Sequence, residues 1–478
     1  MNTSARTYKA RQGSLAQKLP RKAILLMGHN KVPRNYMANP LPFRQDSTFL
    51  FFTGVTEPGA ALLIWPDGTS TLYLPFPTDD DTLWHGRQVP PEFIARKAGA
   101  RAVFPAETLP DALQELKKMN VPVVALPVCE PTANQTLQEL LGPELSPHSL
   151  ETANEELLDA VIDGRLRRDD GEIAEMRWAL EVTATAHRQA MMATHPGVTD
   201  YEIHALIEAI FTSNGMTSAY PPIVTIEGEV LHGQADGKEL KDGQLLLVDA
   251  GAETPSGYAS DVTRTWPVNG KFSVRQKQIY QAVLLAQSAA IKRCQKGVLF
   301  EDVHMAAARS LVQFCVNLEL MKGDVDELVE LGAHAAFFPH GIGHLLGLDV
   351  HDMELFGDRV GYGKDGKRSK QFGMNHLRLN RRLEEGMVVT VEPGFYIIPS
   401  LLRDQGMRDT LGDRIYWEEA HRLAPFGGIR IEDDVLITSD GPDVLSAGIP
   451  KEIRSIQNLV GSGPTPKDRF VPPEESGN

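Results

Sequence analysis

Four carboxylates and a cluster of histidines in this chain have residue types and contexts that suit a metal site. The stretch 337–352, "FFPHGIGHLLGLDVHD", contains His340, His344 and His351 within twelve residues. Asp249 in "VDAG" ends a run of leucine and valine. Burial of a lone carboxylate there would cost several kcal/mol unless a cation or a donor compensates its charge. A turn aspartate before a glycine is the alternative interpretation of Asp249.

Three further acids repeat this pattern along the chain. Asp261 lies twelve residues after Asp249 in "GYASDVTRTW", a second strand-like run. A hairpin of these two runs would bring both carboxylates side by side. Glu392 in "VVTVEPG" and Glu432 in "IRIEDD" also stand inside β-branched runs. Four strand carboxylates of this kind are hard to explain by structure alone, because strand interiors favour apolar side chains.

Their charges match a two-metal site. Four carboxylates and one neutral imidazole, that of His344, would balance two divalent cations. Oxygen-dominated ligation with a single imidazole suits Mn²⁺, Mg²⁺ or a similarly hard ion. Two ions about 3.5–4 Å apart can activate a shared water and polarise a carbonyl, which is the chemistry of amide or ester hydrolysis. The sequence has no Gly-x-Ser-x-Gly elbow and no phosphate-binding loop that would indicate another chemistry.

The elements that must position these residues follow from the apolar pattern. The first third alternates short, strand-like apolar runs such as "TFLFFTG" and "AALLIW" with helical patterns such as "PDALQELKKM", which indicates an α/β domain. A long amphipathic helix is expected over 169–193. Beyond it, strand-like runs that carry the acids alternate with helical stretches, which indicates an α+β sheet with a polar site on one face.

We place the domain boundary near Asp163. Residues 1–163 are predicted to form a smaller amino-terminal α/β domain and residues 164–455 the catalytic domain. Residues 456–478 are rich in proline, glycine and charge, and we predict a disordered tail there.

Composition excludes several kinds of partner. The chain has 478 residues and 42% hydrophobic content, enough for two domains. Its 48 basic and 63 acidic residues give a net charge of −15, so we expect neither nucleic acid nor a membrane as a partner. No secretory signal or long apolar run is apparent, and three widely spaced cysteines suggest no disulfide framework, so we expect a cytoplasmic protein.

Five ordered motifs carry a resemblance to a known family: "VDAG", "YASDVTRTWPVNGKF", "PHGIGHLLGLDVHD", "VEPGFY" and "GGIRIEDD". They resemble the proline-specific M24-type metallopeptidases of the pita-bread fold, Xaa-Pro dipeptidase (prolidase) and aminopeptidase P. The resemblance covers residues 165 to 445 and reaches "FRQDSTFLFFTGVTEPGAALLI" near the amino terminus. It implies a pita-bread catalytic domain and two divalent ions, Mn²⁺ first with Co²⁺ or Zn²⁺ as alternatives. It also implies a proline-containing peptide substrate and a homodimer or homotetramer.

The resemblance also assigns roles to residues. It makes five residues metal ligands: Asp249, Asp261, His344, Glu392 and Glu432. Asp261 and Glu432 would each bind both ions. Glu392 would also be a general base. The other catalytic residues would be His232, which helps proton transfer, and His340 and His351. His340 lies beside the metals and His351 contacts substrate, and both would hold the peptide and supply its leaving nitrogen with a proton. Arg430 would orient a ligand or contact substrate.

Proton transfer is needed because a proline nitrogen in a peptide bond carries no hydrogen and must be protonated as it leaves. A loop histidine is the alternative for His232, and a surface cation for Arg430. The segment before His232 is shorter than in the family and contains two prolines, so no role is carried onto Tyr220.

The two proline-specific activities differ in whether the carboxylate of the proline is recognised. A guanidinium pairs well with a carboxylate. Prolidases have an arginine fourteen residues before the "VEPG"-type glutamate, and Arg378 stands fourteen residues before Glu392. Aminopeptidase P generally lacks this arginine. A surface arginine is the alternative for Arg378, since the stretch around it is basic.

We therefore predict a Xaa-Pro dipeptidase in which Arg378 binds substrate, with aminopeptidase P as the alternative. A metal-free binding protein of the same fold is a third possibility, which the five filled ligand positions disfavour. The stretch 353–376 has no counterpart that we can place. We expect a solvated loop there, with a cover over the mouth of the site as the alternative.

Overall fold

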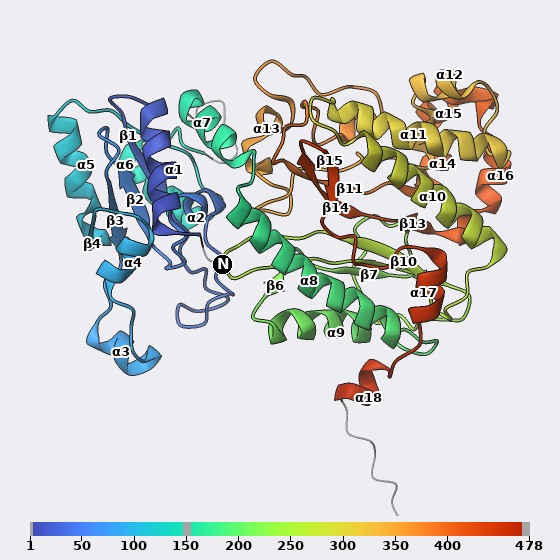
Figure 1. Cartoon of the computed structure of the whole chain (residues 1–478), viewed down its shortest axis with the longest axis horizontal. Coiled ribbons are helices and arrows are strands. Elements are labelled where there is room, and N and C mark those ends of the chain that lie inside the picture. The colour runs from blue at the N-terminus through green and yellow to red at the C-terminus, as the bar shows by residue number, and fades with distance from the viewer. Residues whose placement is uncertain (1–2, 147–153, 471–478) are drawn as a thin grey trace, which may run out of the picture. The chain divides into compact units, whose positions relative to one another are not determined.

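The computed structural model describes residues 3–146 and 154–470, and the chain forms two compact units (Figure 1). The amino-terminal unit comprises Met1–Glu172 with Met353–Gly357, and the carboxyl-terminal unit comprises Ile173–Asp352 with Asp358–Asn478. The main division follows Glu172 rather than the expected Asp163. The reason is local: Arg11 of the first helix forms ion pairs with Asp169 and Glu172, which hold this segment to the first unit.

The described residues of the amino-terminal unit contain a five-stranded mixed sheet in the order β4-β3-β2-β1-β5. Two strand pairs, β1 with β5 and β3 with β4, are parallel, and the others are antiparallel. The strands are β1 (Ala23–Met27), β2 (Ala61–Ile64), β3 (Ser70–Leu74), β4 (Ala102–Pro105) and β5 (Val123–Ala125). The helices are α1 (Ala5–Lys18), α2 (Ser47–Thr53), α3 (Asp79–His85), α4 (Pro91–Lys97), α5 (Leu109–Lys118), α6 (Pro131–Leu141) and α7 (Glu155–Arg165).

The core of this unit joins the sheet to α5 and α6. Leu113 and Leu116 of α5 and Leu137 of α6 are buried with Leu25 and Leu63 of the sheet. The α/β character predicted for the first domain is therefore confirmed.

One apolar run of this unit folds differently from the prediction. The run "TFLFFTG", grouped with the strand-like runs, forms helix α2. The Asp46 side chain accepts a hydrogen bond from the backbone N–H of Phe49 and so caps the start of the helix. Gly54 ends the helix with a φ of +61°, which glycine adopts readily. The helix is buried on all sides, so its sequence shows no amphipathic period.

The described part of the carboxyl-terminal unit is built from small antiparallel sheets: β10-β8-β7, β11-β14-β15, β12-β13 and β6-β9. The strands are β6 (Thr217–Ser218), β7 (Ile223–Thr225), β8 (Leu245–Asp249), β9 (Ala252–Glu253), β10 (Thr263–Pro267), β11 (Val388–Val391), β12 (Gly394–Tyr396), β13 (Gly428–Arg430), β14 (Asp433–Thr438) and β15 (Gly441–Val444). This arrangement confirms the α+β prediction.

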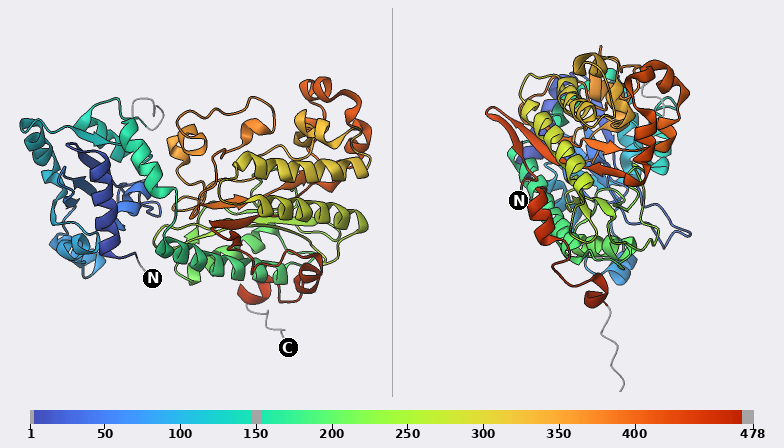
Figure 2. Two further views of the ribbon diagram at one scale, coloured as in Figure 1. Left: turned by 45° about the horizontal axis from the view of Figure 1, so that its top comes forward. Right: turned by 90° about the vertical axis from the view of Figure 1, so that its right-hand side faces the viewer.

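Long helices accompany these strands. The helix expected over 169–193 is present as α8, and α10 begins with a capping box of Ser273 and Gln276. Helices α10 and α11 run side by side (Figure 2). The longer helices are α8 (Asp170–Ala193), α9 (Asp200–Ser213), α10 (Val274–Arg293) and α11 (Phe300–Asn317). The shorter ones are α12 (Val325–Glu330), α13 (Asp358–Tyr362), α14 (Pro399–Leu402), α15 (Gln405–Leu411), α16 (Trp417–Arg422), α17 (Ile453–Leu459) and α18 (Pro466–Phe470).

The predicted disordered tail is folded up to Phe470. The second half of α17 and all of α18 lie within it, and Ile456 of α17 is fully buried. The backbone N–H groups of Gly461 and Gly463 donate to the carbonyls of Met191 and Met192 at the end of α8. These anchors outweigh the polar composition that suggested disorder, and residues 471–478 lie outside the described residues.

Two general expectations concern the membrane and the cysteines. Across residues 3–146 and 154–470, no helix is long and apolar enough to cross a membrane. Cys129 is exposed, Cys294 and Cys315 are buried, and none of the three forms a disulfide within the described residues.

Candidate metal centre

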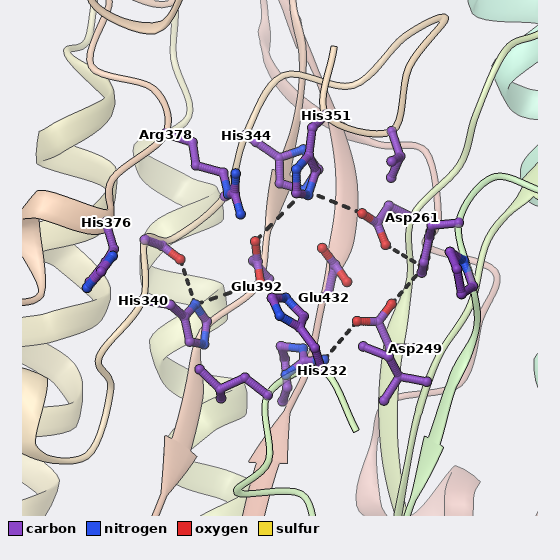
Figure 3. A pocket seen from close by; sticks show the side chains of 18 of the residues that line it. His232, Asp249, Asp261, His340, His344, His351, His376, Arg378, Glu392 and Glu432 are labelled. Carbon is purple, nitrogen blue, oxygen red and sulfur yellow. Dashed lines mark hydrogen bonds and ion pairs between the residues drawn. The ribbon is translucent and has the colours of Figure 1, made fainter. Parts of the chain in front are cut away.

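The five predicted ligands all line one cavity of about 660 Å³ in the carboxyl-terminal unit (Figure 3). Asp249 is the last residue of β8, and antiparallel pairing sets Thr263 of β10 opposite it. Asp261, two residues before β10, therefore lies beside Asp249, as the hairpin prediction requires. Glu392 and Glu432 do not lie inside continuous strands, because each falls in the break between two, β11 and β12 or β13 and β14.

Three of these residues form the tightest group of donors. One donor atom each of Asp261, His344 and Glu432 lies within 4.8 Å of the others. His344 Nε2 is 3.3 Å from Asp261 Oδ2 and 3.9 Å from Glu392 Oε1. His344 Nδ1 donates to the Leu345 carbonyl at 3.0 Å, so the lone pair of Nε2 faces the carboxylates. This is the orientation that a metal-binding imidazole needs.

The electrostatics of the cavity call for cations. Asp261 and Glu432 are buried, with 5% and 2% of their surface exposed. Burial raises the pKa of Asp261, and the neighbouring Asp249 carboxylate raises it further. Burial likewise raises the pKa of Glu432, and repulsion from Asp261 and Glu392 adds to it. Such a set of crowded oxygen donors with one imidazole fits divalent cations, which would offset the repulsion.

Arg430 supplies fixed positive charge at one side of the site. Its Nη2 donates to Asp249 Oδ2 at 2.8 Å, and its Nε donates to Thr263 Oγ1 at 3.1 Å. Burial raises the pKa of Asp249, but the Arg430 guanidinium together with hydrogen bonds from Tyr220, Arg430 and Thr263 outweighs burial and holds that pKa below its ordinary value. Arg430 Nη1 also donates to the Tyr396 hydroxyl at 3.2 Å. The expected contact between Arg430 and a predicted ligand is therefore present.

The four remaining predicted residues also line the cavity: His232, His340, His351 and Arg378. His340 Nδ1 donates to the Gly341 carbonyl at 2.8 Å, and the Tyr396 hydroxyl donates to His340 Nε2 at 2.8 Å. Burial lowers the pKa of His340 to about 3, so its ring is neutral. The His351 ring lies 4.1 Å from the His344 ring, centroid to centroid. Burial lowers the pKa of His232 as well, although this residue stands on an exposed loop.

The sequence analysis assigned no role to Tyr220, Thr263 and Tyr396, which contact predicted site residues, nor to Gln234 and His376, which line the cavity. Thr263 donates its hydroxyl hydrogen to Glu432 Oε2 at 2.8 Å. The Tyr220 hydroxyl lies 2.6 Å from Asp249 Oδ1 and 2.6 Å from Asp261 Oδ1, so it holds both carboxylates together. The available signal was strand pairing, because β7 begins three residues after Tyr220 and pairs with the end of β8.

Tyr220→Phe is expected to weaken metal binding about 10- to 100-fold, the usual effect of losing a group that orients metal ligands. Burial raises the pKa of Tyr220 well above its ordinary value, so the hydroxyl stays protonated and can donate to either carboxylate. Isothermal titration of the metal-free protein with Mn²⁺ measures the change. Tyr416→Phe, at a tyrosine with 40% exposure, is the control and should bind as the wild type does. Equal affinities for Tyr220→Phe and wild type would contradict this role.

Comparison with known proteins matches both units of the chain. Residues 174–439 match Metallopeptidase family M24, and residues 8–124 match the Aminopeptidase P, N-terminal domain. The Xaa-Pro aminopeptidase of Escherichia coli (strain K12) is 34% identical over 468 residues, covering 95% of this chain and 96% of that protein. The Xaa-Pro dipeptidase of Mus musculus is 32% identical over 446 residues, covering 91% and 88%.

Solved structures give the same result. The aminopeptidase PepP of Pseudomonas aeruginosa superposes with a TM-score of 0.78 at 31% identity, covering 96% of this chain and 98% of that one. The aminopeptidase P II of Yersinia pestis has a TM-score of 0.77 at 30% identity and covers 96% and 99%. These similarities confirm the predicted fold, a pita-bread catalytic domain with a smaller domain before it. Relatives of both activities share a similar percentage of identical residues with this chain, so sequence identity does not distinguish a dipeptidase from an aminopeptidase.

Proposed function

The chain belongs to metallopeptidase family M24, and from this premise we propose that it is a Xaa-Pro dipeptidase with a dinuclear metal site. Family M24 enzymes use divalent metal ions and act on peptides. Both kinds of similar protein, Xaa-Pro aminopeptidases and Xaa-Pro dipeptidases, are named for the Xaa-Pro unit of their substrates. Our proposal concerns three points: that the substrate is a dipeptide, how many ions of which kind are bound, and what each residue does.

The donor set supports two hard divalent ions. Two ions would be held by Asp249, Asp261, His344, Glu392 and Glu432, which all line the cavity. Mn²⁺ is the first candidate and Co²⁺ or Zn²⁺ the alternatives, because oxygen donors dominate the set. Bound ions of this kind supply an activated water and polarise the carbonyl of the scissile bond.

The protein's own residues then handle protons. Glu392 is assigned the role of general base, because its carboxylate lines the cavity and burial raises its pKa toward neutrality. The leaving proline nitrogen needs a proton, and His232 and His351 line the same cavity. His340 is a poor donor, since its ring is neutral and both nitrogens have partners, so we assign it to the wall of the pocket.

The position of the Arg378 side chain is the observation that supports the dipeptidase proposal. Its side chain points into the cavity that holds the five ligands (Figure 3). Arg430 lines the same cavity, but its guanidinium is bound to Asp249 and Tyr396. We assign recognition of the substrate's free carboxylate to Arg378, which stands fourteen residues before Glu392 and can pair with a carboxylate through two parallel hydrogen bonds.

Arg378→Ala is expected to lower kcat/KM for a Xaa-Pro dipeptide about 10- to 100-fold, the effect of losing hydrogen bonds to a charged group. Cleavage of a tripeptide with proline second should change little. Both rates are measured on manganese-loaded protein, with Arg382→Ala, an exposed arginine four residues further on, as the control. Unchanged dipeptide cleavage in Arg378→Ala would overturn the assignment.

Aminopeptidase activity on longer peptides is the second candidate. It is supported by the 34% identity to the Escherichia coli Xaa-Pro aminopeptidase and by the superposition on aminopeptidase structures. Wild-type protein that cleaves the tripeptide and leaves the dipeptide intact would establish this candidate and exclude the dipeptidase. We further propose a cytoplasmic location, which the free thiols suit, and a homodimer or homotetramer.

A further inference from the structure

We propose that the segment Asp358–Leu377 is a fixed support that aims Arg378 into the cavity, and that Tyr362 and Arg368 are positioning residues for recognition of the substrate carboxylate. The inference rests on the proposed dipeptidase function. Neither Tyr362 nor Arg368 is among the residues that line the cavity, and both act through the backbone beside Arg378.

The carbonyl of Leu377, which belongs to the peptide group that joins Leu377 to Arg378, receives two side-chain donors. The Tyr362 hydroxyl donates to it at 2.6 Å, and Arg368 Nη1 donates to it at 2.8 Å. Arg368 Nη1 also donates to the Asn375 carbonyl at 3.0 Å. These bonds fix the peptide plane from which the Arg378 side chain starts.

Arg368 is itself held in place. Its Nε and Nη2 donate to the two carboxylate oxygens of Asp358, at 2.5 to 3.3 Å. Its guanidinium also lies over the Tyr362 ring, 5.1 Å from the centroid. Tyr362 is buried, with 7% of its surface exposed. The three side chains therefore form one cluster under the backbone of Arg378.

Helix α13 presses against the backbone of Arg378 directly. A Cβ atom built on Gly361 would lie 2.1 Å from the Arg378 carbonyl oxygen, so a side chain does not fit there. Two residues after Arg378, the backbone N–H of Asn380 donates to the Gly361 carbonyl at 2.8 Å. The residues before and after Arg378 in the sequence are thus both in close contact with α13.

The far end of the segment is anchored as well. Gln371 Nε2 donates to the Glu330 carbonyl at 3.0 Å. A Cβ atom on Gly373 would lie 2.8 Å from the Cβ of Ala335, so the backbone is packed tightly there. The expectation of a solvated loop over 353–376 holds for the exposed residues 364–372 and is wrong for the packed residues on either side.

A fixed support matters because Arg378 is an exposed residue with a long side chain. Ordering such a side chain on binding costs roughly 0.5–1.5 kcal/mol, and a rigid starting point reduces that cost. Loss of the support should therefore weaken recognition of the carboxylate and leave the chemistry at the metals unchanged.

The test compares Ala-Pro with Ala-Pro amide, which has the same scissile bond and no carboxylate. Tyr362→Phe and Arg368→Met are each expected to raise KM for Ala-Pro about 3- to 10-fold, the effect of losing one hydrogen bond, with kcat within twofold. KM for the amide should not change. Arg382→Met is the matched control, because Arg382 also donates to a backbone carbonyl, that of Gly297, and is exposed. It should leave both substrates unaffected.

A double mutant separates positioning from general stability. In the Arg378→Ala background, Tyr362→Phe should not raise KM for Ala-Pro further, because both changes act on one contact. Additive effects, or equal changes for Ala-Pro and its amide, would overturn the support role.

The same assay distinguishes failure of this inference from failure of the proposed function. If Arg378→Ala lowers the preference for Ala-Pro over the amide and Tyr362→Phe and Arg368→Met do not, only the support role is wrong. If Arg378→Ala itself leaves that preference unchanged, the dipeptidase proposal and the inference fail together.

Discussion

Glu432→Gln is expected to abolish peptide cleavage and at the same time to stabilise the metal-free protein. Activity should fall by about 10³-fold or more, because a metal ion that polarises the carbonyl contributes several kcal/mol to the transition state. Stability should rise by roughly 1–3 kcal/mol, because one member of a buried, crowded set of carboxylates becomes neutral. The two results in opposite directions distinguish a metal ligand from a residue that supports the fold.

The geometry explains why the amide is tolerated. Glu432 has 2% exposure and accepts a hydrogen bond from Thr263, and a glutamine oxygen can accept that same bond. Repulsion from Asp261 and Glu392 acts on the carboxylate and is absent for the amide. The metal-free variant therefore loses an unfavourable interaction and keeps its packing.

The measurements are urea unfolding without metal and melting temperature with added Mn²⁺. Wild-type protein should melt at a higher temperature when Mn²⁺ is added, since a ligand that binds the folded state stabilises it, and the variant should show little of this rise. Asp440→Asn, at an exposed turn between β14 and β15, is the control and should match wild type in both assays. A metal-free Glu432→Gln protein that is less stable than wild type would contradict the argument.

The ligands could be predicted from sequence because their signal is local. Asp249, Glu392 and Glu432 each interrupt a run of β-branched or leucine residues, which is costly unless something binds there. Even so, the runs around the two glutamates were predicted as unbroken strands, whereas each divides into two. The break follows from tertiary packing: the N–H groups of Glu392 and Glu432 bond to Ile342 and Thr263 rather than to a strand ladder.

Tyr220 and Thr263, which also orient the ligands, could not be predicted, because their contacts join distant parts of the chain. Tyr220 reaches carboxylates 29 and 41 residues away, and Thr263 reaches Glu432 across 169. A tyrosine or a threonine in a strand-like run is most often part of a core, so nothing local marks these residues. Helix α2, by contrast, could have been predicted from local sequence, because Asp46 and Gly54 are typical residues for the start and the end of a helix.

Arg430→Gln is expected to destabilise the metal-free protein by about 3–5 kcal/mol, the usual effect of breaking a buried ion pair. Arg430 is 4% exposed and binds Asp249, Thr263 and Tyr396 together. Without it, the Asp249 carboxylate loses its guanidinium partner and is left beside other acids. Activity should fall about 10- to 100-fold, because a group that orients a metal ligand is lost.

The loss of stability should be smaller when Mn²⁺ is bound, because the ion then compensates the charge of Asp249. Urea unfolding with and without metal measures this difference, and equal losses would contradict the role of Arg430 as a charge partner. Arg430→Lys should recover little, because a lysine cannot donate to Asp249, Thr263 and Tyr396 from one planar group. Tyr396→Phe is the matched comparison: it removes one contact of Arg430 and the hydrogen bond to His340 Nε2, keeps the pair with Asp249, and should cost only about 2 kcal/mol.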